Sequence, residues 1–187
     1  MLPPLDEWDE AILTDVAGMD ECRFLEKKAS DKLRVGTNLE KTAARAELAK
    51  QVCAFSNAGL GYLVYGMPDT GGFDQGVPEI LIGTQEAKAW VEYEIPKLVT
   101  PPVHGFQARF IHVPAVHDPG FGVLVVEVPL SDLRPHWVED NQELAYIRTG
   151  EHSHPMTRQT FLDISSEDKG DAARFKIRAA SPFSPSR

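Results

Sequence analysis

The 187-residue sequence has little that is typical of a membrane or secreted protein. No apolar run approaches the roughly 18 residues that a membrane-spanning helix needs, and the acidic N-terminal stretch lacks the basic start of a signal peptide. The two cysteines, Cys22 and Cys53, have neither the spacing of a zinc site nor the density of a disulfide framework. We therefore expect a cytoplasmic protein without a membrane partner.

The sequence also lacks the basic excess that is typical of proteins that coat DNA. Its formal net charge is −9, and residues 1–26 carry most of it, with eight acids and one base. The rest of the chain is close to neutral, so a local basic face can still form. We interpret the acidity as an argument against strong, indiscriminate binding to duplex DNA.

Hydrophobic periodicity predicts a mixed α/β domain, because segments of helical period alternate with short apolar strands. The helices are expected at residues 5–18, 39–55, 84–99 and 157–164. The strands are expected at residues 24–25, 62–65, 80–82, 106–113, 122–128 and 145–148, of which 106–113 and 122–128 form a hairpin. The core face of the first helix is predicted at Leu5, Trp8, Ile12 and Val16. The core face of the second helix is predicted at Leu39, Ala43, Ala46, Ala49, Val52 and Cys53.

Three parts of the chain differ in composition. Residues 1–18 are predicted to form an acidic N-terminal helix, and residues 19–165 a single domain. Residues 166–187 lose the apolar pattern and end in a Ser- and Pro-rich stretch, so we expect a flexible C-terminal tail.

Short motifs follow one another along most of the chain. They are Glu21-Cys-Arg-Phe-Leu-Glu26-Lys-Lys28, Cys53-Ala-Phe-Ser-Asn57-Ala-Gly-Leu-Gly61-Tyr-Leu-Val-Tyr-Gly66-Met-Pro-Asp69, Arg134-Pro-His136-Trp137, and Tyr146-Ile-Arg148-Thr-Gly150 followed by Ser153-His-Pro155. In this order they resemble the AlbA_2 domain, the nucleic-acid-associated module also found in the Schlafen proteins. The resemblance runs from about Glu21 to Ile164 and implies one α/β (α+β) domain, with a mixed sheet and flanking helices. The usual paired glycines of the family read Leu60-Gly61 here.

The first motif gathers charged side chains. If residues 24–28 are extended, Glu26 and Lys28 share one face of the strand, and Glu21 can join them from the preceding turn. Carboxylates gathered in this way can hold Mg²⁺ or Mn²⁺, and a lysine beside them can neutralise a phosphate. The resemblance to Schlafen nucleases implies an active site of Glu21, Glu26, Lys28 and Asp69 in this chain, with Glu21, Glu26 and Asp69 as metal ligands. The alternative is a solvated, charged strand end.

The late motifs carry groups that bind phosphates, because arginine and protonated histidine donate hydrogen bonds to anions. The candidate phosphate contacts are Lys28, His136, Arg148 and His154. His154 stands where the resembling family usually has a second arginine, and a structural ion pair is the alternative role for Arg148. Trp137 is interpreted as a core residue, and zinc binding by the histidines is a minor alternative.

The leading hypothesis is a nucleic-acid-binding protein that prefers RNA or structured or single-stranded substrates. The first alternative is a metal-dependent, Schlafen-like endoribonuclease. The second is a protein-interaction module without nucleic-acid activity, in which the acidic N-terminal helix recruits a basic partner or covers the module's own groove. Pairing into a homodimer is a further hypothesis, because Schlafens contain this module as an internal pair.

Overall fold

The computed structural model describes residues 2–139 and 144–166 of the chain. The tail predicted at residues 166–187 therefore lies, apart from its first residue, outside the described part. The centre of the described part is a mixed sheet, as predicted. Its strands are β1 (Leu25–Lys28), β2 (Gly61–Tyr65), β3 (Val77–Pro78), β7 (Gln107–His112) and β8 (Phe121–Val128).

The strands of this sheet follow the order β1–β2–β8, and β8 also pairs with β7 and β3. Strands β1 and β2 are parallel, whereas the other pairs are antiparallel. The predicted hairpin is confirmed as β7 and β8. Three two-stranded pairs lie outside the main sheet: β4 (Ile80–Ile82) with β5 (Gln85–Glu86), β6 (Val99–Thr100) with β9 (Trp137–Val138), and β10 (Tyr146–Thr149) with β11 (His152–Pro155).

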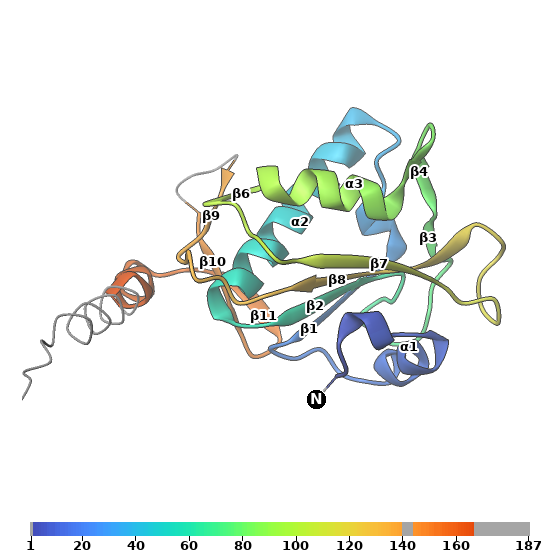
Figure 1. The fold of residues 1–187 in the computed structure, drawn as a ribbon, viewed down its shortest axis with the longest axis horizontal. Helices are drawn as coiled ribbons and strands as arrows, with labels where there is room; N and C mark the ends of the chain where they lie inside the picture. Colours follow the sequence, from blue (N-terminus) through green and yellow to red (C-terminus); the bar gives the residue numbers. More distant parts are fainter. Residues whose placement is uncertain (1, 140–143, 167–187) are drawn as a thin grey trace, which may run out of the picture.

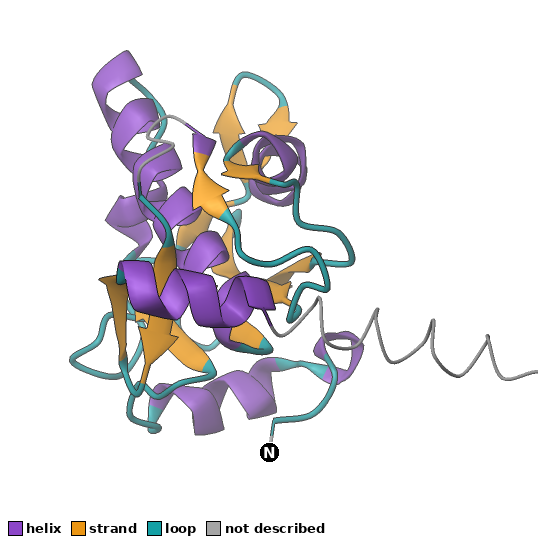
Figure 2. Ribbon diagram, turned by 90° about the vertical axis from the view of Figure 1, so that its left-hand side faces the viewer, coloured by secondary structure: helices purple, strands orange, loops and turns teal. Residues whose placement is uncertain are grey.

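Helices cover both faces of the sheet (Figures 1 and 2). On one face lie α2 (Asn38–Ala58) and α3 (Ala87–Glu94), and on the other lie η1 (Leu5–Glu7) and α1 (Glu10–Ala17). The single-turn helices η2 (Ser30–Leu33) and η3 (Ile95–Lys97) connect them to the strands, and residues 158–166 are helical. None of the helices in the described residues has the length and apolar character that a membrane crossing requires.

The two faces of the sheet bury two hydrophobic cores. Strand β2 serves both, because its side chains alternate: Leu63 and Tyr65 point to the side of α2 and α3, whereas Tyr62 and Val64 point to the N-terminal helices. Strand β8 alternates in the same way. This two-sided burial explains why both strands read as nearly continuous apolar runs in the sequence.

The N-terminal segment is part of the second core. The single helix predicted at residues 5–18 is wrong in detail, because the Asp9 side chain accepts a hydrogen bond from the Ile12 amide at 3.0 Å and starts a new helix there. This restart brings Leu13, rather than Ile12, fully into the core. The Trp8 ring is completely buried and lies 4.9 Å from the Tyr62 ring, centroid to centroid.

The predicted core face of α2 is partly wrong. The helix starts with a capping box between Thr37 and Glu40, and Leu39 in its first turn is 81% exposed. Ala43 and Ala46 are exposed as well. The buried stripe instead runs through Ala44, Leu48 and Val52, at the spacing of one helical turn.

The turn after α2 explains how Leu60 replaces a glycine. Leu60 is 48% exposed, so a side chain fits there. In contrast, a Cβ atom on Gly61 would lie 1.9 Å from the Phe55 ring. Only the second of the two glycine positions therefore requires glycine for packing.

Candidate functional site

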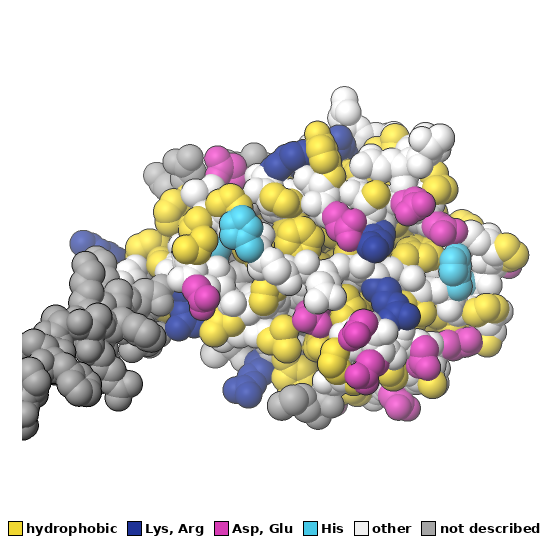
Figure 3. All heavy atoms as spheres, viewed as in Figure 1, with side chains coloured by type: hydrophobic (Ala, Val, Ile, Leu, Met, Phe, Trp, Pro, Cys, Tyr) yellow, Lys and Arg dark blue, Asp and Glu magenta, His cyan; other side chains and the backbone are white. Residues whose placement is uncertain are grey.

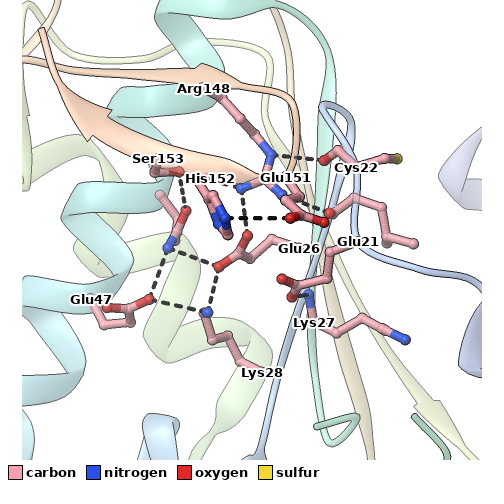
Figure 4. A network of polar contacts seen from close by, with 12 residues as sticks. Glu21, Cys22, Glu26, Lys27, Lys28, Glu47, Arg148, Glu151, His152 and Ser153 are labelled. Atoms are coloured by element: carbon pink, nitrogen blue, oxygen red, sulfur yellow. Dashed lines mark hydrogen bonds and ion pairs between the residues drawn. The ribbon is translucent and has the colours of Figure 1, made fainter. Parts of the chain in front are cut away.

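A buried polar network lies where the end of β1, the middle of α2 and the hairpin β10–β11 meet (Figure 4). Strand alternation places Glu26 and Lys28 on the same side of β1, and that side faces α2. Helix α2 contributes Glu47 and Gln51, which are one turn apart. With two residues of the hairpin, the Glu26 network comprises Glu26, Lys28, Glu47, Gln51, Arg148 and Ser153.

Both carboxylate oxygens of Glu26 are engaged, although this residue is only 5% exposed. Its Oε2 accepts a hydrogen bond from Arg148, and its Oε1 contacts the Lys28 ammonium and accepts from Nε2 of Gln51 at 3.1 Å. The same Gln51 amide donates to Glu47 at 2.9 Å, and its oxygen accepts from the Ser153 hydroxyl at 2.7 Å. A buried carboxylate is tolerated only when charges and hydrogen bonds compensate it, and the network supplies both.

The Lys28 ammonium lies between two carboxylates. It forms an ion pair with Glu26, and its Nζ lies 3.7 Å from Oε1 of Glu47. Burial lowers the pKa of Lys28, but the hydrogen bond to Glu26 and the charges of Glu26, Glu47 and Glu21 outweigh burial and leave the pKa above its ordinary value. Lys28 is therefore a cation at neutral pH, and 21% of its side chain is exposed.

Arg148 closes the outer edge of β1. Its Nε donates to the carbonyl of Cys22 at 2.9 Å and its Nη2 to the carbonyl of Leu25 at 2.8 Å. The guanidinium pairs with Glu26 and lies 4.9 Å from the centroid of the Phe55 ring. With its side chain fully buried, Arg148 has the structural ion pair that was the alternative to a phosphate contact.

Glu21 also serves the edge of β1, because its Oε1 accepts a hydrogen bond from the Lys27 amide at 2.7 Å. Burial raises the pKa of Glu21 above its ordinary value; the Lys27 amide opposes this shift, and the charge of Glu26 adds to it. The Lys27 ammonium adds no exposed charge to the site, because it is buried and donates to the Met19 carbonyl at 2.6 Å.

Asp69 is an exposed residue in the loop after β2. Within residues 2–139 and 144–166, no group of three or more His, Cys, Asp or Glu side chains is arranged to hold a metal ion. Glu21, Glu26 and Asp69 therefore do not form the predicted ligand set in this arrangement. Both oxygens of Glu26 are already engaged within the chain, so a divalent ion at this position would have to replace one of these contacts. Binding of Mg²⁺ or Mn²⁺ stays a prediction.

His136 was predicted to contact phosphate, but it is completely buried in the core. Its backbone amide donates to the Asn57 side chain at 2.7 Å, and its Nδ1 lies 2.6 Å from the Pro101 carbonyl. Burial lowers the pKa of His136, the hydrogen bond with Pro101 opposes this effect, and His104 adds to it. A buried, neutral imidazole does not reach a phosphate in solvent. Asn57 of the second motif thus has a structural role, since it also donates to the Tyr146 carbonyl at 2.8 Å.

His154 is exposed on β11, a strand that the sequence did not predict. His152 lies on the same side of this strand because strand side chains alternate, and the two rings are 6.0 Å apart in an edge-to-face arrangement. Ser153, between them, points inward to Gln51. The hairpin thus joins an outer pair of histidines to the Glu26 network.

Three members of the network were not predicted from the sequence: Glu47, Gln51 and Ser153. Two weak sequence patterns could have indicated these three residues. Glu47 and Gln51 are four positions apart in a helical segment, which places them on one face. Ser153 alternates with two histidines, as expected for a strand with one inner and one outer side.

The family model described as Schlafen, AlbA_2 matches residues 21–157, more than half of the chain. No curated protein matches the sequence. Among solved structures, the DIP2311 protein from Corynebacterium diphtheriae is similar in fold, with a TM-score of 0.53 and 17% sequence identity over 85% of this chain. This chain spans 28% of the length of that protein. At this identity the likeness establishes the fold alone.

Proposed function

The chain belongs to the Schlafen AlbA_2 family, and we propose that it binds nucleic acid through the outer face of the β10–β11 hairpin and the adjoining exposed part of Lys28. The observation that carries this proposal is the pair of exposed histidines, His152 and His154, on a strand whose Ser153 contacts the network that holds Lys28, a lysine that stays charged at neutral pH. Imidazole rings donate hydrogen bonds to phosphates and stack on unpaired bases.

RNA or single-stranded substrates are favoured over long duplex DNA. The net charge of −9 repels a polyanion at long range. Exposed acids also gather over η1 and α1, the region that Figure 3 shows rich in Asp and Glu side chains. Small, local contacts to flexible strands avoid this acidic surface, whereas a rigid duplex extends past a short site. High-affinity binding that prefers duplex DNA would contradict this preference.

The first test compares fluorescence anisotropy of labelled single-stranded RNA, single-stranded DNA and duplex DNA at one fixed salt concentration. The double variant His152→Ala/His154→Ala should bind single-stranded RNA about tenfold more weakly than the wild type, since it loses two contacts. The matched control is His104→Ala, which removes an exposed histidine from the loop before β7 instead. Equal affinity of the double variant and the wild type would refute the proposed surface.

A gain of charge tests the same surface in the opposite direction. His154→Arg restores a fixed positive charge and should tighten RNA binding and make it more dependent on salt. Each added phosphate contact increases the slope of log K against log salt by about 0.7 for a single strand. An unchanged slope would place His154 outside the contact.

A metal-dependent endoribonuclease is the second candidate, because the structure brings Glu21, Glu26 and Lys28 together at β1. Glu21→Gln is the sharpest variant, since it removes the charge but keeps an oxygen for the Lys27 amide. Labelled tRNA and single-stranded RNA are incubated with wild type and variant in Mg²⁺, Mn²⁺ or EDTA. Cleavage that needs metal and is lost in Glu21→Gln supports this candidate, and equal cleavage by both contradicts it. If the chain neither binds nor cleaves these RNAs, the result would favour a protein-interaction module.

A further inference from the structure

The two outer edges of the main sheet differ. At β1, the side chains of Arg148 and Glu21 satisfy backbone groups that would otherwise face outward. At β7, the ladder runs to β8 alone, and no further strand follows within the described residues. Figure 1 shows β7 as the strand nearest to the viewer, at the front of the sheet. The chain thus closes one edge and leaves the other open.

Apart from the charge of Arg109, strand β7 lacks the usual features that prevent edge pairing. Its six residues, Gln107–His112, contain no proline, glycine, lysine or acid, and their register with β8 has no bulge. Natural proteins protect exposed edges with such features because unpaired N–H and C=O groups bind another strand. The guanidinium of Arg109 is engaged within the chain, since it donates hydrogen bonds to the carbonyls of Leu5 and Asp6 in η1.

The sequence of β7 is complementary to itself in one antiparallel register. Opposite residues must point to the same side of a sheet, so the twofold axis has to pass through a residue and not between two. Centring on Arg109 would place two arginines opposite each other, which is unfavourable. Centring on Phe110 places the two phenylalanines together, and opposes Arg109 to Ile111 and Ala108 to His112.

We propose that two copies of this chain pair through β7, antiparallel and centred on Phe110, and extend the sheet across a twofold axis. Helix α3 packs beside β7. Each copy carries a charge of −9, so salt weakens the repulsion between copies and strengthens the dimer. Salt has the opposite effect on nucleic-acid binding, so the two proposals are tested independently.

The decisive experiment uses the double variant Ala108→Cys/His112→Cys in a Cys22→Ser background. In the proposed register the cysteine at position 108 of one copy faces the cysteine at position 112 of the other copy. Their Cα atoms are about 4.5–5.5 Å apart, which is within reach of a disulfide. Within one strand the two positions are about 13 Å apart, so no internal disulfide forms. Mild oxidation should convert most of the double variant into a covalent dimer on a non-reducing gel.

Each single variant is the matched control, because its cysteine lies about 13 Å from its own symmetry copy. Linkage of the single variants as efficient as that of the double variant would overturn the register. Sedimentation equilibrium of the unmodified chain needs no substitution. Its mass should rise from 20.7 kDa towards twice that value with concentration and with salt. A chain that stays monomeric throughout would overturn the pairing itself.

Discussion

Replacing Arg148 by methionine should destabilise the fold strongly, whether or not the replacement also changes nucleic-acid binding. Methionine keeps an extended side chain in the buried site but removes the ion pair with Glu26 and the hydrogen bonds to the carbonyls of Cys22 and Leu25. Removing one partner of a buried ion pair costs about 3–5 kcal/mol. We expect a loss of this size, because the Arg148 side chain is fully buried and its partner Glu26 is nearly so. Typical domains have only about 5–15 kcal/mol of stability in total.

Urea unfolding at neutral pH, followed by circular dichroism, measures this loss. The midpoint of Arg148→Met should fall while the slope stays that of the wild type, since the surface exposed on unfolding hardly changes. His154→Met is the control, because it introduces the same side chain at an exposed position nearby. Its stability should lie within about 0.5 kcal/mol of the wild type. A similarly small change for Arg148→Met would refute the structural role of this arginine.

A double-mutant cycle tests whether Glu26 is the partner that matters. Either single variant, Arg148→Met or Glu26→Gln, leaves a charge without its main partner, whereas the double variant removes both. The double variant should therefore be less destabilised than the sum of the two single variants, by at least about 1 kcal/mol. Simple additivity would show that the two residues act independently. The cycle also explains why loss of cleavage in Glu26→Gln alone would be a poor sign of catalysis.

Three further results are expected. Because the pKa of Glu21 in the folded chain lies above its ordinary value of 4.5, the stability that it contributes is present at low pH and declines as the pH rises above 4.5. Glu21→Gln should lack this decline, and urea midpoints that change in parallel with the wild type from acidic to neutral pH would contradict it. Burial raises the pKa of the Cys53 thiol to about 11, so a thiol reagent at neutral pH should label Cys22 and spare Cys53 until the chain is unfolded. Mass spectrometry of the labelled peptides checks this, and equal labelling rates in the folded chain would count against it. Gly61→Ala should cost about 1–3 kcal/mol by overpacking against Phe55, because the added Cβ would lie 1.9 Å from that ring; an unchanged thermal midpoint would be the opposing result.

The central strands could be predicted from the sequence because their burial leaves a local trace. Residues 62–65 and 122–128 read as apolar runs, and both form strands of the main sheet. The helix boundaries were less accessible, because they depend on single caps. The hydrogen bond from the Ile12 amide to Asp9 divides the first helix, and hydrophobic period alone contains no record of it.

The site was predictable only in part, for a related reason. Glu26 and Lys28 are neighbours on one strand, so their shared face followed from alternation. The partner of Glu26, however, is Arg148, which is 122 residues away in the chain. Which charged groups pair inside a fold depends on how distant segments meet, and one sequence does not record this. A motif residue such as His136 can therefore serve the core as readily as a ligand.

The N-terminal segment has a consequence for how this protein can be divided. The family model begins at residue 21, whereas Leu5, Trp8, Leu13 and Val16 belong to the core on one side of the sheet. A fragment cut at the family boundary would leave Tyr62, Val64 and their neighbours facing water, and it should aggregate rather than reveal a hidden binding groove. In this chain the unit that relatives share is smaller than the unit that folds, so residues before the shared motif have to accompany it in any experiment on the isolated domain.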